Sequence, residues 1–318
     1  MRFLFVLDPL EKLDLKWDTS LTILRELNRR GHKTFAADAP DFRIEGKNVW
    51  VRANEAASEF VKTSHRYIYS AAKVYNAGEF HLIFIRKNPP FDGAYLNLTY
   101  VLDLAARRVP VINDPQGIRD TNEKLSILQF PRWIPETLVA GSPQQILEFQ
   151  RKIGSALVIK PLDEKGGKGV FLLKPKERAG RLKLEKATGE GKKFVLAQRF
   201  LKNTFAPGEK RILILNGKFA AVYEKRPPGD DFRANLGLSG STFHSASLTK
   251  REEKLVRDVG PFLLKRKIYF AGIDVLNERL IEINVTSPAG ITEIMFLQPE
   301  TRLVEKVAGF LENCAARE

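Results

Sequence analysis

The segment RLIEINVTSP, residues 279–288, places a carboxylate and a carboxamide two positions apart in a run rich in branched aliphatic residues. Alternate residues of an extended strand share a face, so Glu282 and Asn284 point one way while their aliphatic neighbours point the other. One face of this strand is therefore core, and the other carries chemistry or faces solvent.

The preceding segment, AGIDVLN, adds Asp274 if the two segments form an antiparallel hairpin. A three-residue loop over 277–279 places Asp274 opposite Glu282, whereas a two-residue loop places it on the opposite face. The aliphatic pattern predicts the three-residue loop, because that loop sends to the core Ile273, Val275, Ile281, Ile283 and Val285. Asp274, Glu282 and Asn284 then form an oxygen donor set that suits Mg²⁺. Solvent-facing polar residues would alternate in the same way, but the pairing of the strands favours the metal site.

A glycine-rich stretch, LDEKGGKGV, lies between the predicted strands LVIKP and VFLLK. Glycines allow several backbone amides to converge on an anion, so this turn could cover a nucleotide, although a simple β-turn explains it equally well. A Walker motif needs Lys followed by Ser or Thr and then a helix, and these are missing. Lys160 ends the strand before the turn, and Lys124 opens a helix predicted over 121–129; each could reach phosphates or be an ordinary exposed lysine.

Strand and helix patterns alternate in the first third of the chain. Strands are predicted over 2–8, 33–38, 81–87 and 109–114, helices over 19–32 and 95–108, and a hairpin over 41–53. This alternation predicts a mostly parallel sheet covered by helices. Later strands are predicted over 157–161, 170–174, 193–201, 210–226 with a turn at Asn216–Gly217, and 269–285, with helices over 249–266 and from about 299.

Composition narrows the class of protein. The 318 residues, 43% hydrophobic and 28% charged, suffice for two or three packed units. The apolar runs are too short to cross a membrane, no signal peptide is visible, and Cys314 is the single cysteine, so a reducing cytoplasm fits best. A net charge of +14 raises the question of nucleic acid, but the basic residues are spread along the chain without a recognition motif, which favours an enzyme that handles anions.

Together the motifs resemble the bacterial type of glutathione synthetase, a family of ATP-grasp ligases. They run in order along the chain: RKNPPFDGAYLNLTYVLD, VINDPQGIRDTNEKL, VIKPLDEKGGKGVF, GEKRILILNGKF, FRANL, AGIDV and EINVTSP. The resemblance implies an α/β, or α+β ATP-grasp, fold. An N-terminal Rossmann-like parallel-sheet domain (1–121) would precede a two-part ATP-grasp module, made of a central lid (122–200) and a C-terminal subdomain (201–318).

The resemblance also implies roles for individual residues. Those at ATP would be Lys124, Lys160, Gly166 and Gly167 at the phosphates, the segment Gln198, Arg199, Phe200 and Leu201 at adenine, and Glu209 at the ribose. Asp274, Glu282 and Asn284 would bind magnesium, expected as two ions, with Mn²⁺ as a substitute. The reacting groups would be stabilised by Arg211, Arg233 and Asn235, and the peptide substrate would be held by Asp18, Ser20, Arg86, Ser287 and Pro288.

The implied reaction joins γ-glutamyl-cysteine to glycine through an acyl phosphate, in an enzyme expected to be a homo-oligomer. The chain departs from the family pattern at Ser239, Ala289 and Thr292, near the substrate end, which leaves the amine acceptor open. Alternatives are a related ligase with another acyl or amine substrate and a nucleotide-binding regulator without turnover, against which the intact acidic set argues. A nucleic-acid binder is the most distant alternative.

Overall fold

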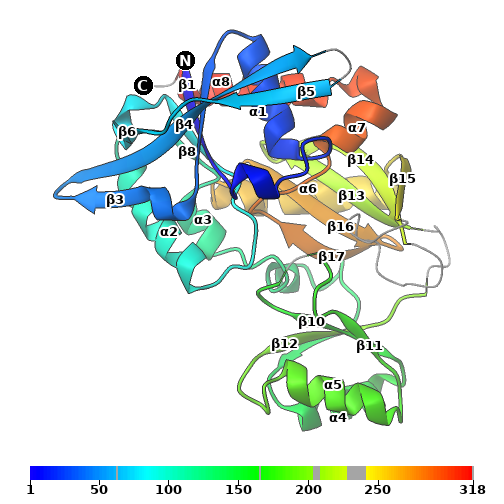
Figure 1. Ribbon diagram of the computed structural model, residues 1–318. Coiled ribbons are helices and arrows are strands. Elements are labelled where there is room, and N and C mark those ends of the chain that lie inside the picture. Colours follow the sequence, from blue (N-terminus) through cyan, green and yellow to red (C-terminus); the bar gives the residue numbers. More distant parts are fainter. Residues whose placement is uncertain (62–63, 165, 203–207, 228–240, 317–318) are drawn as a thin grey trace.

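Three β-sheets follow one another along the part of the chain that the structure describes (Figure 1). The computed structural model describes residues 1–61, 64–164, 166–202, 208–227 and 241–316. No helix in these segments is both long and apolar enough to cross a membrane. Each sheet contributes a different part of the candidate site.

The N-terminal sheet has the order β3-β4-β2-β1-β7-β8, with β5 and β6 also paired to β4. Its parallel strands are β1 (Arg2–Val6), β2 (Lys33–Ala37), β7 (Leu82–Ile85) and β8 (Val111–Ile112). The antiparallel additions are β3 (Phe42–Glu45), β4 (Asn48–Val61), β5 (Ser64–Tyr69) and β6 (Lys73–Asn76). With helices α1 (Thr19–Arg29), α2 (Gly93–Ala105) and α3 (Pro115–Arg119), the parallel part confirms the predicted strand and helix alternation.

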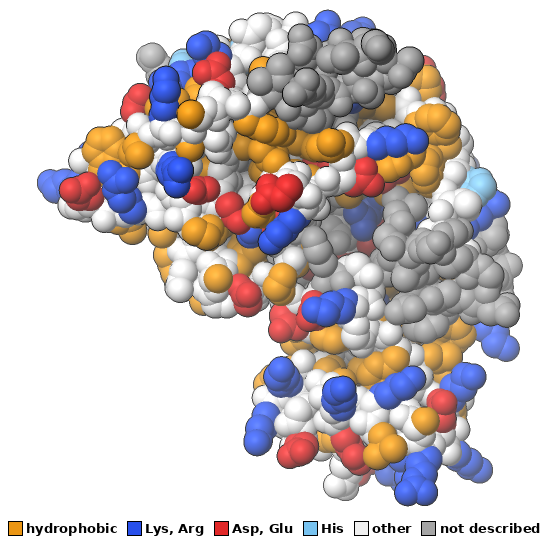
Figure 2. All heavy atoms as spheres, viewed as in Figure 1, with side chains coloured by type: hydrophobic (Ala, Val, Ile, Leu, Met, Phe, Trp, Pro, Cys, Tyr) orange, Lys and Arg blue, Asp and Glu red, His pale blue; other side chains and the backbone are white. Residues whose placement is uncertain are grey.

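The second sheet is antiparallel and stands apart from the rest of the molecule in Figure 1, with two helices on one face. Its strands, in the order β11-β10-β12-β9, are β11 (Phe171–Leu173), β10 (Leu157–Pro161), β12 (Val195–Arg199) and β9 (Thr137–Ala140). Helices α4 (Pro143–Ile153) and α5 (Arg178–Ala187) close a small separate core around Leu157, Leu173 and Leu184. We call this unit the lid; many exposed Lys and Arg side chains cover it in Figure 2.

The third sheet, which we call the C-terminal sheet, has the order β15-β14-β13-β16-β17. Its strands are β13 (Glu209–Leu215), β14 (Lys218–Arg226), β15 (Thr242–Ser245), β16 (Phe270–Leu276) and β17 (Arg279–Asn284). Helices α6 (Lys250–Lys265) and α7 (Ile291–Leu297) pack against this sheet, whereas α8 (Leu303–Ala315) packs against α1 and β7 of the N-terminal part. The turn predicted at Asn216–Gly217 is confirmed, and both of its residues have positive φ.

The helix predicted over 121–129 is wrong. Helix α3 ends at Arg119, and only a short 3₁₀ turn, Ser126–Gln129, follows. Between them the Asn122 side-chain oxygen accepts hydrogen bonds from the backbone N–H groups of Lys124 and Leu125, each at 3.0 Å. Such a local side-chain turn competes with helix formation, so Lys124 lies in a turn rather than at a helix start.

The β16–β17 hairpin confirms the predicted pairing but not the predicted loop. Asp274 lies opposite Glu282, as expected, yet the loop has two residues, Asn277 and Glu278, with φ of 48° and 58°. The register shifts next to Asp274, and this bulge restores the alignment that a two-residue loop would otherwise remove. As a consequence Leu280 is fully buried, while Ile281, which was expected in the core, is only half-buried.

Candidate active site

One row of paired residues crosses all five strands of the C-terminal sheet. In strand order, the directly paired residues are Ser245, Tyr223, Arg211, Asp274 and Glu282. Directly opposite residues on neighbouring strands share a face, so the row forms one line on one side of the sheet. Arg211 and Asp274 form a two-point ion pair within it, with Nε to Oδ1 at 2.6 Å and Nη2 to Oδ2 at 2.9 Å. The fold therefore places the candidate catalytic arginine beside the candidate metal ligands.

Gly272 gives the Arg211 side chain room to lie along this face. A Cβ on Gly272 would come within 3.0 Å of Arg211 Cδ and 3.5 Å of its Nη1. The same Nη1 donates to the carbonyl oxygen of Ala289 at 3.3 Å, which ties the arginine to the segment after β17. A larger residue at position 272 would displace the guanidinium.

Lys225 is a buried cation that sequence reasoning missed. Its ammonium contacts Glu209, its partner across the β13–β14 pair, and lies 3.0 Å from Asp274 Oδ1. Burial raises the pKa of Asp274, but Arg211 and Lys225 outweigh burial and hold this pKa well below its usual range. Burial raises the pKa of the Glu209 carboxyl in spite of Lys225. The sequence did contain a pattern that indicates this position: Tyr223 and Lys225 alternate in β14, opposite the two polar residues Arg211 and Glu209 of β13.

The three candidate metal ligands lie next to one another. Asn284 Nδ2 donates to Asp274 Oδ2 at 3.2 Å, and Glu282 Oε1 lies 3.2 Å from the Lys124 ammonium. The candidate set consists of two carboxylates and one amide. The described segments contain no group of three His, Cys, Asp or Glu side chains that could hold a metal. These oxygen donors fit a hard divalent ion that also binds a nucleotide. The cations that now pair with the carboxylates could then pair with the phosphates of that nucleotide.

Two buried lysines approach this set from the lid and its connection. Lys160, on β10, donates to Gln198 Oε1 at 3.1 Å and to the carbonyl of Ile281 at 3.4 Å. Burial lowers the pKa of Lys160. Lys124 donates to the carbonyl of Glu164 at 2.5 Å in addition to its contact with Glu282. Both ammonium groups are therefore buried at the junction of the lid and the C-terminal sheet, which refutes the simple reading of exposed lysines.

The glycine turn connects β10 to β11 and begins just after Lys160 in the sequence. Gly166 and Gly167 have φ of 61° and 75°, a region that favours glycine. A Cβ on Gly166 would meet no atom within 4 Å, so space remains around it. Gly166 is therefore required for its backbone conformation, whereas a Cβ on Gly169 would also come within 2.8 Å of Pro161.

The candidate adenine segment lies where β12 ends. Gln198 is buried and donates to Thr137 Oγ1 at 3.0 Å, while the Arg199 guanidinium pairs with Glu136 at 3.0 Å. The backbone N–H of Phe200 donates to the carbonyl of Ala156 at 2.9 Å, and half-buried Leu201 follows. A nucleotide here would meet the other backbone groups of this segment.

The described candidate substrate residues gather where the N-terminal sheet meets the segment after β17. Arg86 is 3% exposed and donates through Nε to Ser20 Oγ at 3.0 Å and through Nη2 to the Pro288 carbonyl at 2.9 Å. Its Nη1 is buried and has no hydrogen-bond partner among the described residues, and burial lowers the pKa of Arg86 to about 10. Asp18 caps α1 by accepting from the backbone of Ser20 at 2.7 Å. Ser287 donates to Asn88 Oδ1 at 2.7 Å.

Arg233 and Asn235, the other two candidate catalytic residues, lie outside the described residues, as does Ser239. Thr292, one of the departures from the family pattern, forms a 2.9 Å contact between its hydroxyl and that of Thr22 on α1. At this position the chain thus makes a neutral contact between helices.

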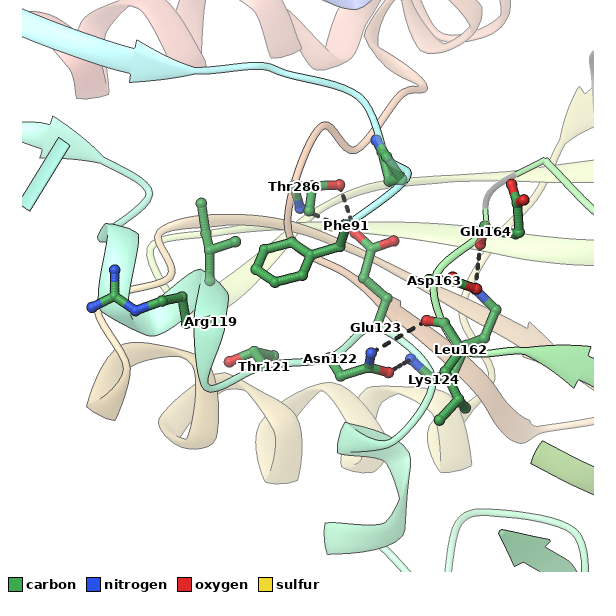
Figure 3. Close-up of a pocket in the computed structure, with 12 residues that line it drawn as sticks. Phe91, Arg119, Thr121, Asn122, Glu123, Lys124, Leu162, Asp163, Glu164 and Thr286 are labelled. Carbon is green, nitrogen blue, oxygen red and sulfur yellow. Dashed lines mark hydrogen bonds between the residues drawn. The ribbon is translucent and has the colours of Figure 1, made fainter. Parts of the chain in front are cut away.

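A small pocket lies beside Lys124 where the lid connects to the rest of the protein (Figure 3). Its half-buried carboxylate, Glu123, accepts hydrogen bonds from the backbone N–H groups of Val285 at 2.9 Å and Thr286 at 3.1 Å and from the Thr286 hydroxyl at 2.8 Å. Burial raises the pKa of Glu123. Figure 3 shows Phe91 next to this carboxylate. Glu123, which sequence reasoning missed, fastens the Lys124 turn to the strand end that carries Asn284.

Comparison with known proteins agrees with this geometry. Residues 1–119 match the family model of the prokaryotic glutathione synthetase N-terminal domain, and residues 123–299 match that of its ATP-grasp domain. Glutathione synthetase from Gloeobacter violaceus is 39% identical over 100% of this chain and 99% of the relative, and the one from Nitrosomonas europaea is 35% identical over 92% of each.

Solved structures show the same fold at low identity. D-cycloserine synthetase DcsG has a TM-score of 0.69 at 13% identity, covering 97% of this chain and 99% of that one. D-alanyl-alanine synthetase A from Vibrio cholerae has a TM-score of 0.64 at 15% identity, covering 99% and 98%. The ATP-grasp ligase fold, its nucleotide and a divalent metal are common to such enzymes. With both family models matched in order and relatives similar over the full length, this chain belongs to the prokaryotic glutathione synthetase family.

Proposed function

We propose that this protein is an ATP-dependent ligase that joins γ-glutamyl-cysteine to glycine, giving glutathione, ADP and phosphate. The observation that carries the proposal is the row Arg211, Asp274 and Glu282, with the two buried lysines Lys124 and Lys160 at its Glu282 end. Cations and oxygen donors thus meet on one face, which phosphoryl transfer to a carboxylate requires.

The nucleotide end of the site is built for phosphates. Lys160 and Lys124 would contact the phosphates, and the Gly166–Gly167 turn would close over them and keep water away from the acyl phosphate. Backbone groups of 198–201 would hold adenine, and Glu209 the ribose. We propose two Mg²⁺ ions on Asp274, Glu282 and Asn284, replaceable by Mn²⁺. When bound, the metal neutralises charge on the transferring phosphate.

At the other end, Arg211 would stabilise the reacting phosphate and carboxylate, together with Arg233 and Asn235. The dipeptide would lie against Asp18, Ser20, Ser287 and Pro288. Arg86 supports this placement because its buried Nη1 makes no hydrogen bond among the described residues and could donate one to a substrate carboxylate. Arg211 would then hold the reacting carboxylate, and Arg86 a second carboxylate of the dipeptide, before the amine binds.

The organisation around the site is also part of the proposal. We place the domain boundaries after residues 121 and 200, because the lid sheet and the C-terminal sheet begin at Thr137 and Glu209. We further propose a cytoplasmic homo-oligomer. The proposed reaction does not depend on the domain boundaries, the cellular location or the oligomeric state.

Phosphate release with ATP and Mg²⁺, measured across a panel of dipeptides and amines, tests the function. We expect product from γ-glutamyl-cysteine and glycine, and at least about 100-fold slower turnover in a Glu282→Gln variant, which should bind Mg²⁺ poorly. Product only from another acyl and amine pair would overturn the glutathione assignment and leave a related ligase. That alternative draws on the Thr22–Thr292 contact, since it gives the acceptor end no charged side chain at position 292.

A further inference from the structure

The row of polar residues has a second end that the proposed roles leave unused. From Arg211 the row continues away from Glu282 and the lysines to Tyr223 on β14. Helix α7 packs over this end, where Ile291 and Ile294 share a core with Tyr223. A Cβ on Gly290 would come within 2.7 Å of the Tyr223 ring, so the chain passes close to the sheet here.

Glu293, on α7, is a buried carboxylate at this end. It is 4% exposed, and its Oε2 has no hydrogen-bond partner among the described residues. The charged and titratable groups that act on it are Arg211 and Lys225 from the C-terminal sheet, Asp18 from the start of α1, and Tyr223 beneath it. The carboxylate interacts with its own backbone N–H at the start of α7, but its other oxygen, Oε2, is left unsatisfied. A buried oxygen without a hydrogen bond is costly, so we take Oε2 to be placed for a ligand group.

The two ends of the row divide the reaction between them. Lys124 and Lys160 mark the nucleotide side of Arg211, so the phosphate of an acyl phosphate held by Arg211 would lie towards Glu282. An incoming amine must reach the acyl carbon from the side away from the departing phosphate. On this sheet that side carries Tyr223 and Glu293.

We propose that Glu293 is the catalytic base that accepts a proton from the incoming ammonium, an inference that rests on the proposed ligase function. An N–H bond of the ammonium breaks and its proton moves to Glu293 Oε2. The freed lone pair forms the bond to the acyl carbon, the bond from that carbon to the phosphate oxygen breaks, and the second N–H proton leaves with the phosphate. Burial raises the pKa of Glu293, which makes it a better proton acceptor while Arg211 and Lys225 oppose the shift.

The test compares two amines that differ in the need for a base. Glycine carries an ammonium near neutral pH, whereas hydroxylamine is already a neutral nucleophile and traps acyl phosphates as hydroxamates. In a Glu293→Gln variant at pH 8, kcat with glycine should fall by about 100-fold or more, the usual range for general-base catalysis. Hydroxamate formation from the same dipeptide should stay within about 3-fold of wild type. Glu300→Gln, at an exposed residue just beyond α7, is the matched control.

An equal loss with both amines, or no loss with either, would overturn the role of Glu293. If the variant fails to fold, the wild-type pH profile decides: kcat with glycine should fall on the acid side at a pH above 4.5, while the hydroxylamine rate, divided by the fraction of hydroxylamine that is neutral at each pH, shows no such limb. Parallel acid limbs would overturn the proposal. Failure of the proposed function is distinct, because wild-type protein would then use another amine, and the same variant ratio is measured with that amine.

Discussion

Replacing Asp274 by Asn should destabilise the protein strongly even without substrates. Asp274, Arg211 and Lys225 have only 5%, 12% and 4% of their side chains exposed, so the change leaves two buried cations short of a partner. Removing one member of a buried ion pair costs about 3–5 kcal/mol. Glu209 still neutralises Lys225, so we expect a loss near the lower limit, about 3 kcal/mol, in the free energy of unfolding.

Urea unfolding at pH 7, followed by the tryptophan emission to which Trp133 contributes, measures this loss. Trp133 is a suitable reporter because its carbonyl accepts from the backbone of Leu280 on β17 at 2.8 Å. The pKa of Asp274 lies below its unfolded value of 3.8, so its contribution is present above pH 4 and is lost as the pH falls further. The difference between wild type and variant should therefore shrink below pH 4.

Two controls make the result decisive. Glu253→Gln removes one partner of an exposed pair, with Arg257 at 3.9 Å, and should cost at most about 1 kcal/mol. Combining Asp274→Asn with Arg211→Met should cost less than the sum of the two changes, because the unpaired guanidinium is removed. A loss below about 1 kcal/mol for Asp274→Asn, or additive costs in the double variant, would refute the buried network as a source of stability.

Three further predictions concern catalysis. Glu282→Gln should lower turnover at least about 100-fold in a protein that still folds, with a lower melting temperature because the buried Lys124 loses its charged partner. Near-normal turnover at low millimolar Mg²⁺ would contradict the metal role. Changing Gly166 and Gly167 together to Val should reduce kcat more than ATP affinity measured by calorimetry; an equal effect on both would show that the turn does not act as a cover. Because the pKa of Lys160 is lowered, its charge is lost as the pH rises, so the KM for ATP should increase at alkaline pH in wild type and stay flat in Lys160→Met.

The pairing of Asp274 with Glu282 could be predicted from the sequence, but the means by which it arises could not. A period-2 pattern fixes which residues share a face, and loop length normally fixes register. Here a two-residue loop combines with a bulge, and the two deviations cancel. The pattern of aliphatic residues cannot distinguish this arrangement from a three-residue loop, except by the burial of Leu280 in place of Ile281.

Lys225 and Glu293 show the limit of local patterns. Lys225 lies in a strand that the sequence predicts, whereas Glu293 lies in α7, a helix that the sequence analysis did not predict. The importance of both residues depends on strands and helices distant in the chain. Lys225 gains its role only when β13 brings Glu209 alongside and β16 brings Asp274. Glu293 gains its role only when α7 folds back over β14. The surroundings of both residues are determined by how distant strands and helices pack together, and not by the spacing of residues along the sequence.

Cations surround the carboxylates of the candidate metal site. Asp274 is paired with Arg211 and Lys225, and Glu282 with Lys124, so the carboxylates that would hold a metal have cationic partners within the protein. A divalent ion arriving alone competes with these pairs, whereas an ion arriving with ATP brings phosphates that can take over the same cations. We therefore expect the metal and the nucleotide to favour each other's binding, since each would release the partner that the other requires. This exchange accounts for basic side chains buried within an anion-handling site.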